Sequence, residues 1–140
     1  MLSGSPRPVI IVTGANTYGE IHSCARVSIT HNETVRSGVG FGICHRLLSQ
    51  LSIKSQDPNE LELRCDGLTL ILACRNKQRA EAARAKLCII ADELVRRAKL
   101  SPDYDGHAET FRKNLHIAIH TIDLADIQSV FRFADEIAQK

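Results

Sequence analysis

Two glycine-containing segments have the composition of a turn that binds phosphate. Thr13-Gly14-Ala15-Asn16 follows an apolar run, and Gly38-Val39-Gly40-Phe41-Gly42 opens a stretch with helical spacing. Glycines at such a strand-to-helix turn let the backbone approach a pyrophosphate, and free N–H groups at the helix start attract its charge. Glycines also mark ordinary loops, so the triplet alone is weak evidence. The residues that we predict to contact the ligand are Thr13, Gly14, Asn16, Gly38, Val39 and Gly40.

A basic residue follows the second apolar run of the chain, at Arg75-Asn76. In a dinucleotide-binding fold an acidic side chain at this place binds the ribose 2′-hydroxyl, whereas an arginine accommodates a 2′-phosphate. Arg75 therefore predicts NADP(H) as the cofactor in preference to NAD(H), with Asn76 as a further contact and Lys77 or Arg79 as an assisting cation. The alternative is a structural arginine that caps the sheet edge or pairs with a nearby carboxylate.

The histidines and cysteines lack the spacing of a metal site. His116 and His120 are four residues apart in an expected strand, so they face the same side of it, but the sequence offers no further ligands. The five cysteines form an odd set without a Cys-x-x-Cys pair, which argues against a disulfide framework and a structural metal. We therefore expect structural histidines, no metal and a reducing compartment.

Apolar patterning predicts the elements that position these residues. β-branched and apolar runs predict strands at 9–12, 68–73 and 116–122, of the kind buried on both faces of a parallel sheet. Helical spacing predicts helices at 42–51, starting near Val39, at 77–97 and at 126–138, with turn-rich loops at 52–67 and 99–114. This alternation predicts an α/β protein: the first β-α-β-α-β-α half of a Rossmann-like, doubly wound parallel sheet, in one domain over 1–140.

Composition and charge exclude several classes of partner. The 140 residues are 44% hydrophobic, and 18 basic against 16 acidic residues leave a formal charge of +2. Without a long basic block there is no electrostatic basis for binding nucleic acid. The apolar run after Pro8 is too short for a signal peptide or a membrane span. We expect no nucleic-acid partner, no signal peptide and no transmembrane segment.

A segment at about 17–37 separates the two halves of the glycine-rich turn. It is polar and without a clear period, and a tight turn cannot hold it without moving its halves apart. Codon degeneracy permits an intron that opens within the Thr17 codon and closes within the Ser37 codon. Its length in bases would be a multiple of three, so splicing would keep the reading frame. Its removal would leave Thr-Gly-Ala-Asn-Thr-Gly-Val-Gly. The hypothesis is a retained intron or a wrong gene model; the alternative is a genuine surface insertion.

With that segment set aside, the motifs resemble the short-chain dehydrogenase/reductase family. The resemblance rests on four stretches in order, which are 9–16, 38–48, 68–76 and 122–126. Within the family, the long loops before the second and third strands are similar to the fungal 3-ketosteroid reductases of sterol synthesis. The resemblance implies that Asp123 and Leu124 lie on the adenine side of the cofactor. From the residues alone, Asp123 is equally well explained as the N-cap of the last helix.

The resemblance implies hydride transfer from NADPH to a sterol 3-ketone, with a tyrosine, a lysine four residues later and a serine as catalytic groups. None of them can be assigned here: Tyr18 and Tyr104 are followed four residues later by His22 and Ala108. We therefore expect an N-terminal, cofactor-binding portion without catalytic residues, inactive alone. The alternatives are a non-catalytic binding or scaffolding module, or an enzyme for another lipid or small ketone.

The resemblance also implies the surroundings of the protein. Its substrate would be a sterol ketone bound by the full-length protein, and its partners would be other enzymes of sterol synthesis. It would be located on the cytoplasmic side of the endoplasmic reticulum or of lipid droplets. An unpaired strand at 9–12, without its neighbour in a complete sheet, would further make the chain prone to associate.

Overall fold

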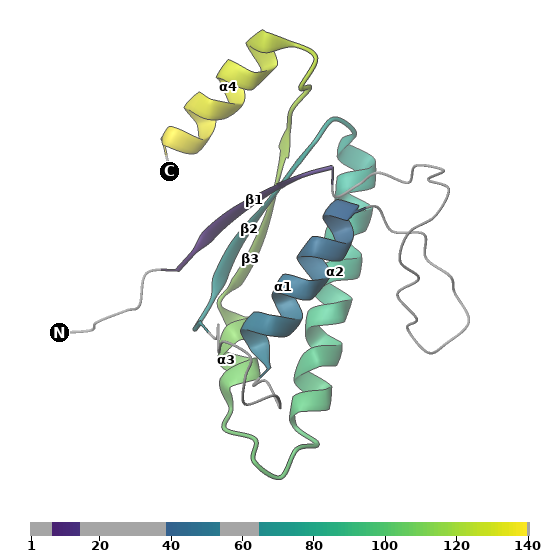
Figure 1. The fold of residues 1–140 in the computed structure, drawn as a ribbon, viewed down its shortest axis with the longest axis vertical. Coiled ribbons are helices and arrows are strands. Elements are labelled where there is room, and N and C mark those ends of the chain that lie inside the picture. The colour runs from purple at the N-terminus through teal and green to yellow at the C-terminus, as the bar shows by residue number, and fades with distance from the viewer. Residues whose placement is uncertain (1–6, 15–38, 54–64, 140) are drawn as a thin grey trace, which may run out of the picture.

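A three-stranded parallel sheet with helices forms the described part of the protein (Figure 1). The structure is a computed structural model, and it describes residues 7–14, 39–53 and 65–139. The elements in chain order are β1 (Val9–Thr13), α1 (Val39–Ser52), β2 (Leu68–Cys74), α2 (Lys77–Ala98), α3 (His107–Lys113), β3 (Leu115–Thr121) and α4 (Ile127–Ala138).

The sheet has the order β1-β2-β3, and both pairings are parallel. Its register aligns Thr13 with Ala73 and Ala73 with His120, so the strands end at the same edge. Three parallel strands joined through helices confirm the predicted α/β class and are consistent with a partial Rossmann-like fold. The predicted strands and the helices at 77–97 and 126–138 are confirmed to within one or two residues.

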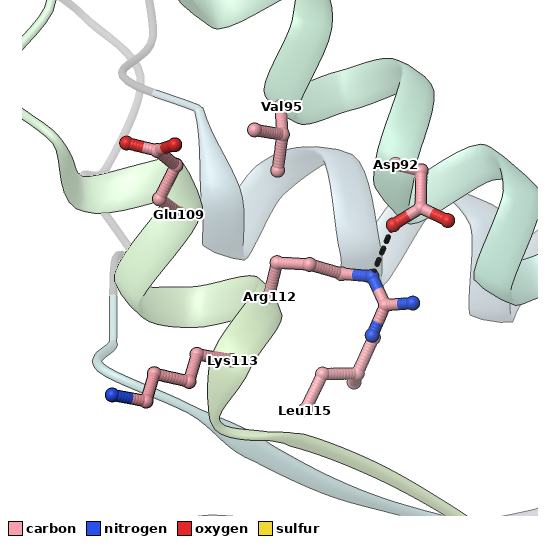
Figure 2. A pocket seen from close by; sticks show the side chains of 6 residues that line it. All are labelled: Asp92, Val95, Glu109, Arg112, Lys113 and Leu115. Atoms are coloured by element: carbon pink, nitrogen blue, oxygen red, sulfur yellow. Dashed lines mark hydrogen bonds and ion pairs between the residues drawn. The ribbon is translucent and has the colours of Figure 1, made fainter.

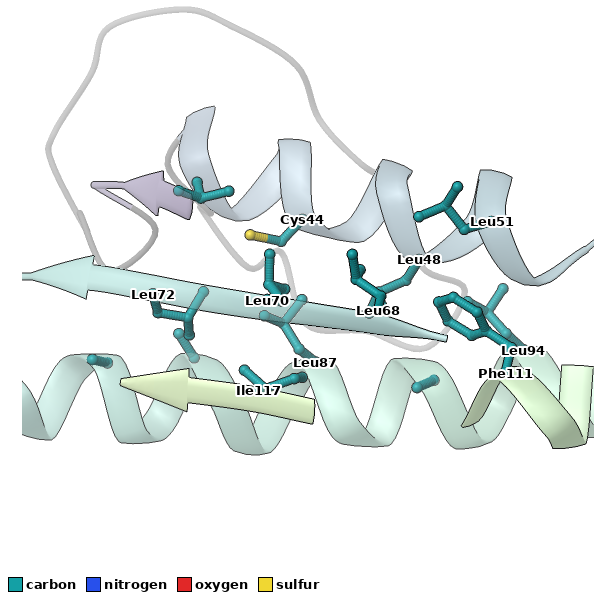
Figure 3. Packing of buried hydrophobic residues seen from close by; sticks show 14 of the residues in the cluster. Cys44, Leu48, Leu51, Leu68, Leu70, Leu72, Leu87, Leu94, Phe111 and Ile117 are labelled. Atoms are coloured by element: carbon teal, nitrogen blue, oxygen red, sulfur yellow. The ribbon is translucent and has the colours of Figure 1, made fainter. Parts of the chain in front are cut away.

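The core lies between one face of the sheet and the helices α1 and α2 (Figure 3). Leu68, Leu70 and Leu72 alternate along β2 and are completely buried against Leu48 of α1 and Leu87 of α2. Alternate residues of a strand point to the same face, so this side of β2 is apolar throughout. Burying each of these leucines contributes about 1.5–3 kcal/mol before the entropy of ordering the chain is counted. This core holds the strand ends in place.

The second face of the sheet is less covered, and α4 is the helix associated with it. Val9 and Ile11 of β1 are 59% and 43% exposed. The last residue of β3 on this face, His120, contacts Glu136 and Phe133 of α4. In Figure 1, α4 lies away from the layer formed by α1 and α2. Because β1 pairs with β2 alone among the described strands, it forms one edge of the sheet.

The prediction of a loop over 99–114 is wrong in its second half, where α3 spans His107–Lys113. Asp105 and Gly106 are turn residues, and they precede the helix: Gly106 has φ 82°, and Asp105 Oδ1 accepts from the His107 N–H at 3.0 Å. Ala108 and Phe111, one helical turn apart, are buried against the core. One short turn of apolar spacing is too little to predict a helix, and tertiary packing supplies the rest of its stability.

Among the residues that the structure describes, no helix combines the length and the apolar character needed to cross a membrane.

Candidate functional site

The predicted ligand contacts that the structure describes all lie at the carboxyl edge of the sheet. Gly14 follows β1, Arg75 follows β2, and Asp123 lies two residues beyond β3. Pairing continues past the strands, because the Ile122 N–H donates to the Cys74 carbonyl at 3.1 Å. The carboxyl edge of a parallel sheet is where open α/β proteins bind their ligands. The structure therefore gathers three sequence motifs that are far apart in the chain.

Gly14 leaves β1 with φ 71°, a backbone conformation that favours glycine. Thr13 before it is exposed. On the other side of the turn, α1 begins at Val39, which is 71% exposed, and Gly40 is buried in its first turn. Asn16, Gly38 and the segment at 17–37 lie outside the described residues, so the prediction of a split glycine turn stays a prediction.

Below this turn, α1 is fixed to the sheet by apolar contacts. Cys44 and Leu48 are completely buried, facing β2 (Figure 3). Burial raises the pKa of the Cys44 thiol to about 11, so this side chain is a neutral, apolar part of the floor. A Cβ added at Gly42 would meet nothing within 4 Å. Close packing therefore does not require glycine at position 42, the third glycine of the motif.

Asn76 has a structural role at the start of α2. With φ −103° and ψ 109°, it is the N-cap, and its Oδ1 accepts from the Arg79 N–H at 3.0 Å. Such a cap is worth about 0.5–2 kcal/mol compared with alanine. Its predicted contact with a cofactor is a separate matter and stays a prediction. The cap fixes the direction in which Arg75, the preceding residue, leaves the sheet.

A cluster of three exposed cations surrounds this helix start. Arg75, Lys77 and Arg79 are all exposed, and the first turn of α2 contains no acidic residue. Within the described part of the chain, the structure records no hydrogen bond or ion pair of these three side chains. Cations near a helix N-terminus oppose the helix dipole by about 0.3–1 kcal/mol each. The surplus positive charge is suited to binding a phosphate.

The turn after β3 is held by hydrogen bonds of Asp123. Its Oδ1 accepts from the Ala125 N–H at 3.0 Å, and its own N–H donates to Ser129 Oγ at 2.9 Å. The interpretation of Asp123 as the N-cap of α4 is wrong. Asp126 is the cap, because its Oδ1 accepts from the Gln128 N–H at 3.0 Å. Leu124 between them is 68% exposed and free of the core.

Ser129 is a residue of this edge that the sequence analysis missed. It is the buried residue of α4, and its Oγ ties the helix to the turn that carries Asp123. The sequence did contain a signal for this role. Ser129 lies in the first turn of a predicted helix that follows a turn with two aspartates, and short hydroxyl side chains near a helix start bond to nearby backbone groups. It fixes the orientation of the predicted adenine-side residues.

His116 and His120 lie on β3, and both belong to the face of the sheet that α4 is attached to. His120 Nδ1 lies 3.0 Å from Glu136 Oε2, and its ring packs edge-on against Phe133 with centroids 5.9 Å apart. No group of three possible ligands occurs within the ranges that the structure describes. His120 therefore has a packing role between β3 and α4.

A shallow pocket lies at the opposite edge of the sheet, between α2, α3 and the start of β3 (Figure 2). Three of its charged groups are in ion pairs: Arg112 Nε lies 2.6 Å from Asp92 Oδ1, and Lys99 neutralises Glu109. Both partnerships shift pKa values toward the charged forms, raising that of Arg112 and lowering that of Glu109. The pocket lining contains two acidic and two basic residues, so its formal charges balance, unlike those at the carboxyl edge. Its lining residues are Asp92, Val95, Glu109, Arg112, Lys113 and Leu115.

No known protein family, curated protein or solved structure matches this chain in the comparisons.

Proposed function

We propose that this chain is the NADP(H)-binding portion of an oxidoreductase of the short-chain dehydrogenase/reductase type. The observation that carries the proposal is the cluster of three exposed cations, Arg75, Lys77 and Arg79, at the carboxyl edge after the central strand, where the first turn of α2 contains no acidic residue. A pyrophosphate and a 2′-phosphate are both anionic, and this edge has a surplus of donors and positive charge.

The residues present fit the cofactor in two further respects. The positive φ of Gly14 turns the backbone at the end of β1, where a dinucleotide-binding fold needs a close approach to phosphate. At the same edge of the sheet, beyond the end of β2, the turn at Asp123 and Leu124 is held by Ser129 and by its own backbone hydrogen bonds. In the proposal, Thr13, Gly14, Val39 and Gly40 contact the pyrophosphate and Arg75 the 2′-phosphate. Asp123 and Leu124 lie beside the adenine.

Bound NADP(H) supplies the hydride in reactions of this class. In the proposal, the residues of this chain only bind and orient the cofactor. They do not supply the catalytic tyrosine–lysine pair, because neither tyrosine has a lysine four residues later. The specific activity that we propose for the whole enzyme is reduction of a sterol 3-ketone. Its substrate contacts and catalytic groups are not among the residues assigned here.

The test is cofactor preference in a variant that lacks residues 18–37, so that the glycine motif is continuous. Calorimetric titration should give tighter binding of NADPH than of NADH. Arg75→Asp should weaken NADPH binding by about tenfold or more, because it removes a charge-assisted bond and repels the phosphate. Arg84→Asp makes the same charge change at an exposed position further along α2 and should leave the preference unchanged.

Equal affinities for NADPH and NADH, or a preference that Arg75→Asp leaves unchanged, would assign Arg75 a purely structural role and refute the proposed specificity. Binding of neither cofactor by a folded variant would instead favour the non-catalytic module.

A further inference from the structure

The turn that begins at Asp123 has internal hydrogen bonds that set its shape. The Asp126 N–H donates to the Asp123 carbonyl at 3.1 Å, and the Ala125 N–H donates to Asp123 Oδ1 at 3.0 Å. Because both bonds lie within the turn, they move with it and do not attach Asp123 to the neighbouring elements. The position of Asp123 therefore depends on other contacts.

Two hydrogen bonds connect the start of this turn to separate elements. On the sheet side, the Ile122 N–H donates to the Cys74 carbonyl at the end of β2, at 3.1 Å. On the helix side, the Asp123 N–H donates to Ser129 Oγ in α4, at 2.9 Å. The second bond is made by Asp123 itself. Ser129 is therefore the side chain that sets where Asp123 lies relative to α4.

The hydroxyl of Ser129 is itself well fixed. Ser129 is only 9% exposed, and it lies in the first turn of α4. Farther along this helix, Glu136 and Phe133 contact His120 of β3. These contacts hold α4 to the sheet, and α4 in turn holds Asp123. A ligand-binding group that is held in this indirect way keeps its geometry only as long as the supporting hydrogen bond is present.

The carboxylate of Asp123 still has an oxygen to offer a ligand. Oδ1 accepts from the Ala125 N–H, whereas Oδ2 has no recorded partner among the residues that the structure describes. An ionised carboxylate only accepts hydrogen bonds, so the facing group must be a donor. Adenine has such a donor in its 6-amino group. A purine with a 6-oxo group would instead place an oxygen against the carboxylate.

We propose that Ser129 is the positioning residue of the adenine contact. Its hydroxyl holds Asp123 so that Oδ2 accepts from the 6-amino group of adenine, an inference that rests on the proposed NADP(H)-binding function. Ser129 then determines base selectivity without touching the cofactor. Without this hydroxyl, the Asp123 N–H has no acceptor, so the turn shifts toward water and the carboxylate moves with it.

The test compares the binding of NADPH with that of its hypoxanthine analogue, which has a 6-oxo group in place of the 6-amino group. Calorimetric titration uses the chain that lacks residues 18–37, as for the proposed function, and is repeated on the 140-residue chain. The parent should bind NADPH about tenfold more tightly than the analogue, as expected for a hydrogen bond to a charged group. Ser129→Ala should reduce this preference to about threefold or less, whereas Ser129→Thr keeps the hydroxyl and should retain it.

Two control variants separate base selectivity from stability. Asp123→Asn keeps an oxygen for the Ala125 N–H and presents amide donors to the base, so it should favour the analogue. Ser52→Ala removes a second buried serine hydroxyl, which donates to the Leu48 carbonyl in α1, and should leave the preference unchanged. Circular dichroism checks that each variant is folded. If Ser129→Ala does not fold, Ser129→Cys provides the same comparison with a weak acceptor of similar size.

The outcomes distinguish this inference from the proposed function. A preference for NADPH that Ser129→Ala leaves unchanged would overturn the inference while the proposed function stands. The same holds if Ser129→Ala weakens both ligands equally, which would assign Ser129 a structural role alone. Equal affinity of the parent for the two ligands would show that the carboxylate does not face the 6-amino group. Binding of neither ligand by the folded parent would refute the proposed function and this inference with it.

Discussion

Gly67 lies directly against Asn114, so that a Cβ added at Gly67 would be 2.6 Å from Asn114 Cβ and 2.8 Å from its carbonyl oxygen. This contact joins the residue before β2 to the residue before β3. Asn114 reinforces it, because its Nδ2 donates to the Asp66 carbonyl at 2.9 Å and its Oδ1 accepts from Arg7 at 3.1 Å. The amino-terminal edge of the sheet depends on this junction.

Gly67→Ala should destabilise the protein by about 1–3 kcal/mol, because the backbone of Asn114 cannot move without disturbing both strands. Gly42→Ala is the matched control. Its new Cβ meets nothing within 4 Å, and alanine is the better helix former in α1 by about 0.5–1 kcal/mol. Urea unfolding of both variants measures the difference. Equal midpoints would show that the junction is looser than described here.

His45 should make the stability of the protein depend on pH. Burial, with a smaller effect of the Arg97 charge, lowers the pKa of His45 from its ordinary 6.5. Between the two pKa values the unfolded chain binds more protons than the folded one, so stability is lost as the pH falls below about 6.5. His45→Gln should reduce this loss of stability. Urea unfolding at about pH 8 and about pH 5, on either side of the ordinary histidine pKa, measures it.

Arg46→Gln controls for the removal of a charge from α1, because Arg46 is an exposed neighbour of His45. Arg97→Gln should reduce the loss of stability at low pH by less than His45→Gln, since burial is the larger cause. An identical pH dependence in the parent and in His45→Gln would contradict the prediction.

Cys44 should be protected from alkylation until the protein unfolds. It is completely buried, and its thiol pKa of about 11 leaves roughly one part in ten thousand as thiolate at neutral pH. Cys88 on α2 is only half-buried and should react before Cys44. Iodoacetamide labelling followed by peptide mass spectrometry measures the order, and labelling in denaturant gives the reference. Early modification of Cys44 would show that α1 opens readily.

The segment at 17–37 should control cofactor affinity if the proposed function is right. We predict weak or no binding of NADPH by the 140-residue chain, because the segment separates the glycines of the motif. Deleting residues 18–37 should strengthen binding by bringing the glycine-rich turn together. Calorimetry on both proteins provides the comparison. Tight, stoichiometric binding by the unaltered chain would contradict the prediction.

The sequence alone predicted the α/β class, the parallel strands and the order of the motifs. Apolar runs and helical spacing are local properties of the chain, so Val9 to Val12 and Leu68 to Ala73 indicate strands without knowledge of their neighbours. The prediction of burial on both faces is confirmed for β2 but wrong for β1, where Val9 and Ile11 are exposed, because β1 is an edge strand among those described. Arg75 could likewise be located just after a strand. That it contacts a cofactor, and that the cofactor is NADP(H), stays a prediction.

Only the tertiary structure decided which residues meet. The N-cap of α4 is Asp126 and not Asp123, because the Ser129 hydroxyl accepts the Asp123 N–H and the turn places Asp126 before the helix. Helix α3 forms where turn residues predicted a loop, since the core buries Phe111. The contact of Gly67 with Asn114 joins residues distant in the chain. Such outcomes depend on the register and packing of separate elements, which no local pattern encodes.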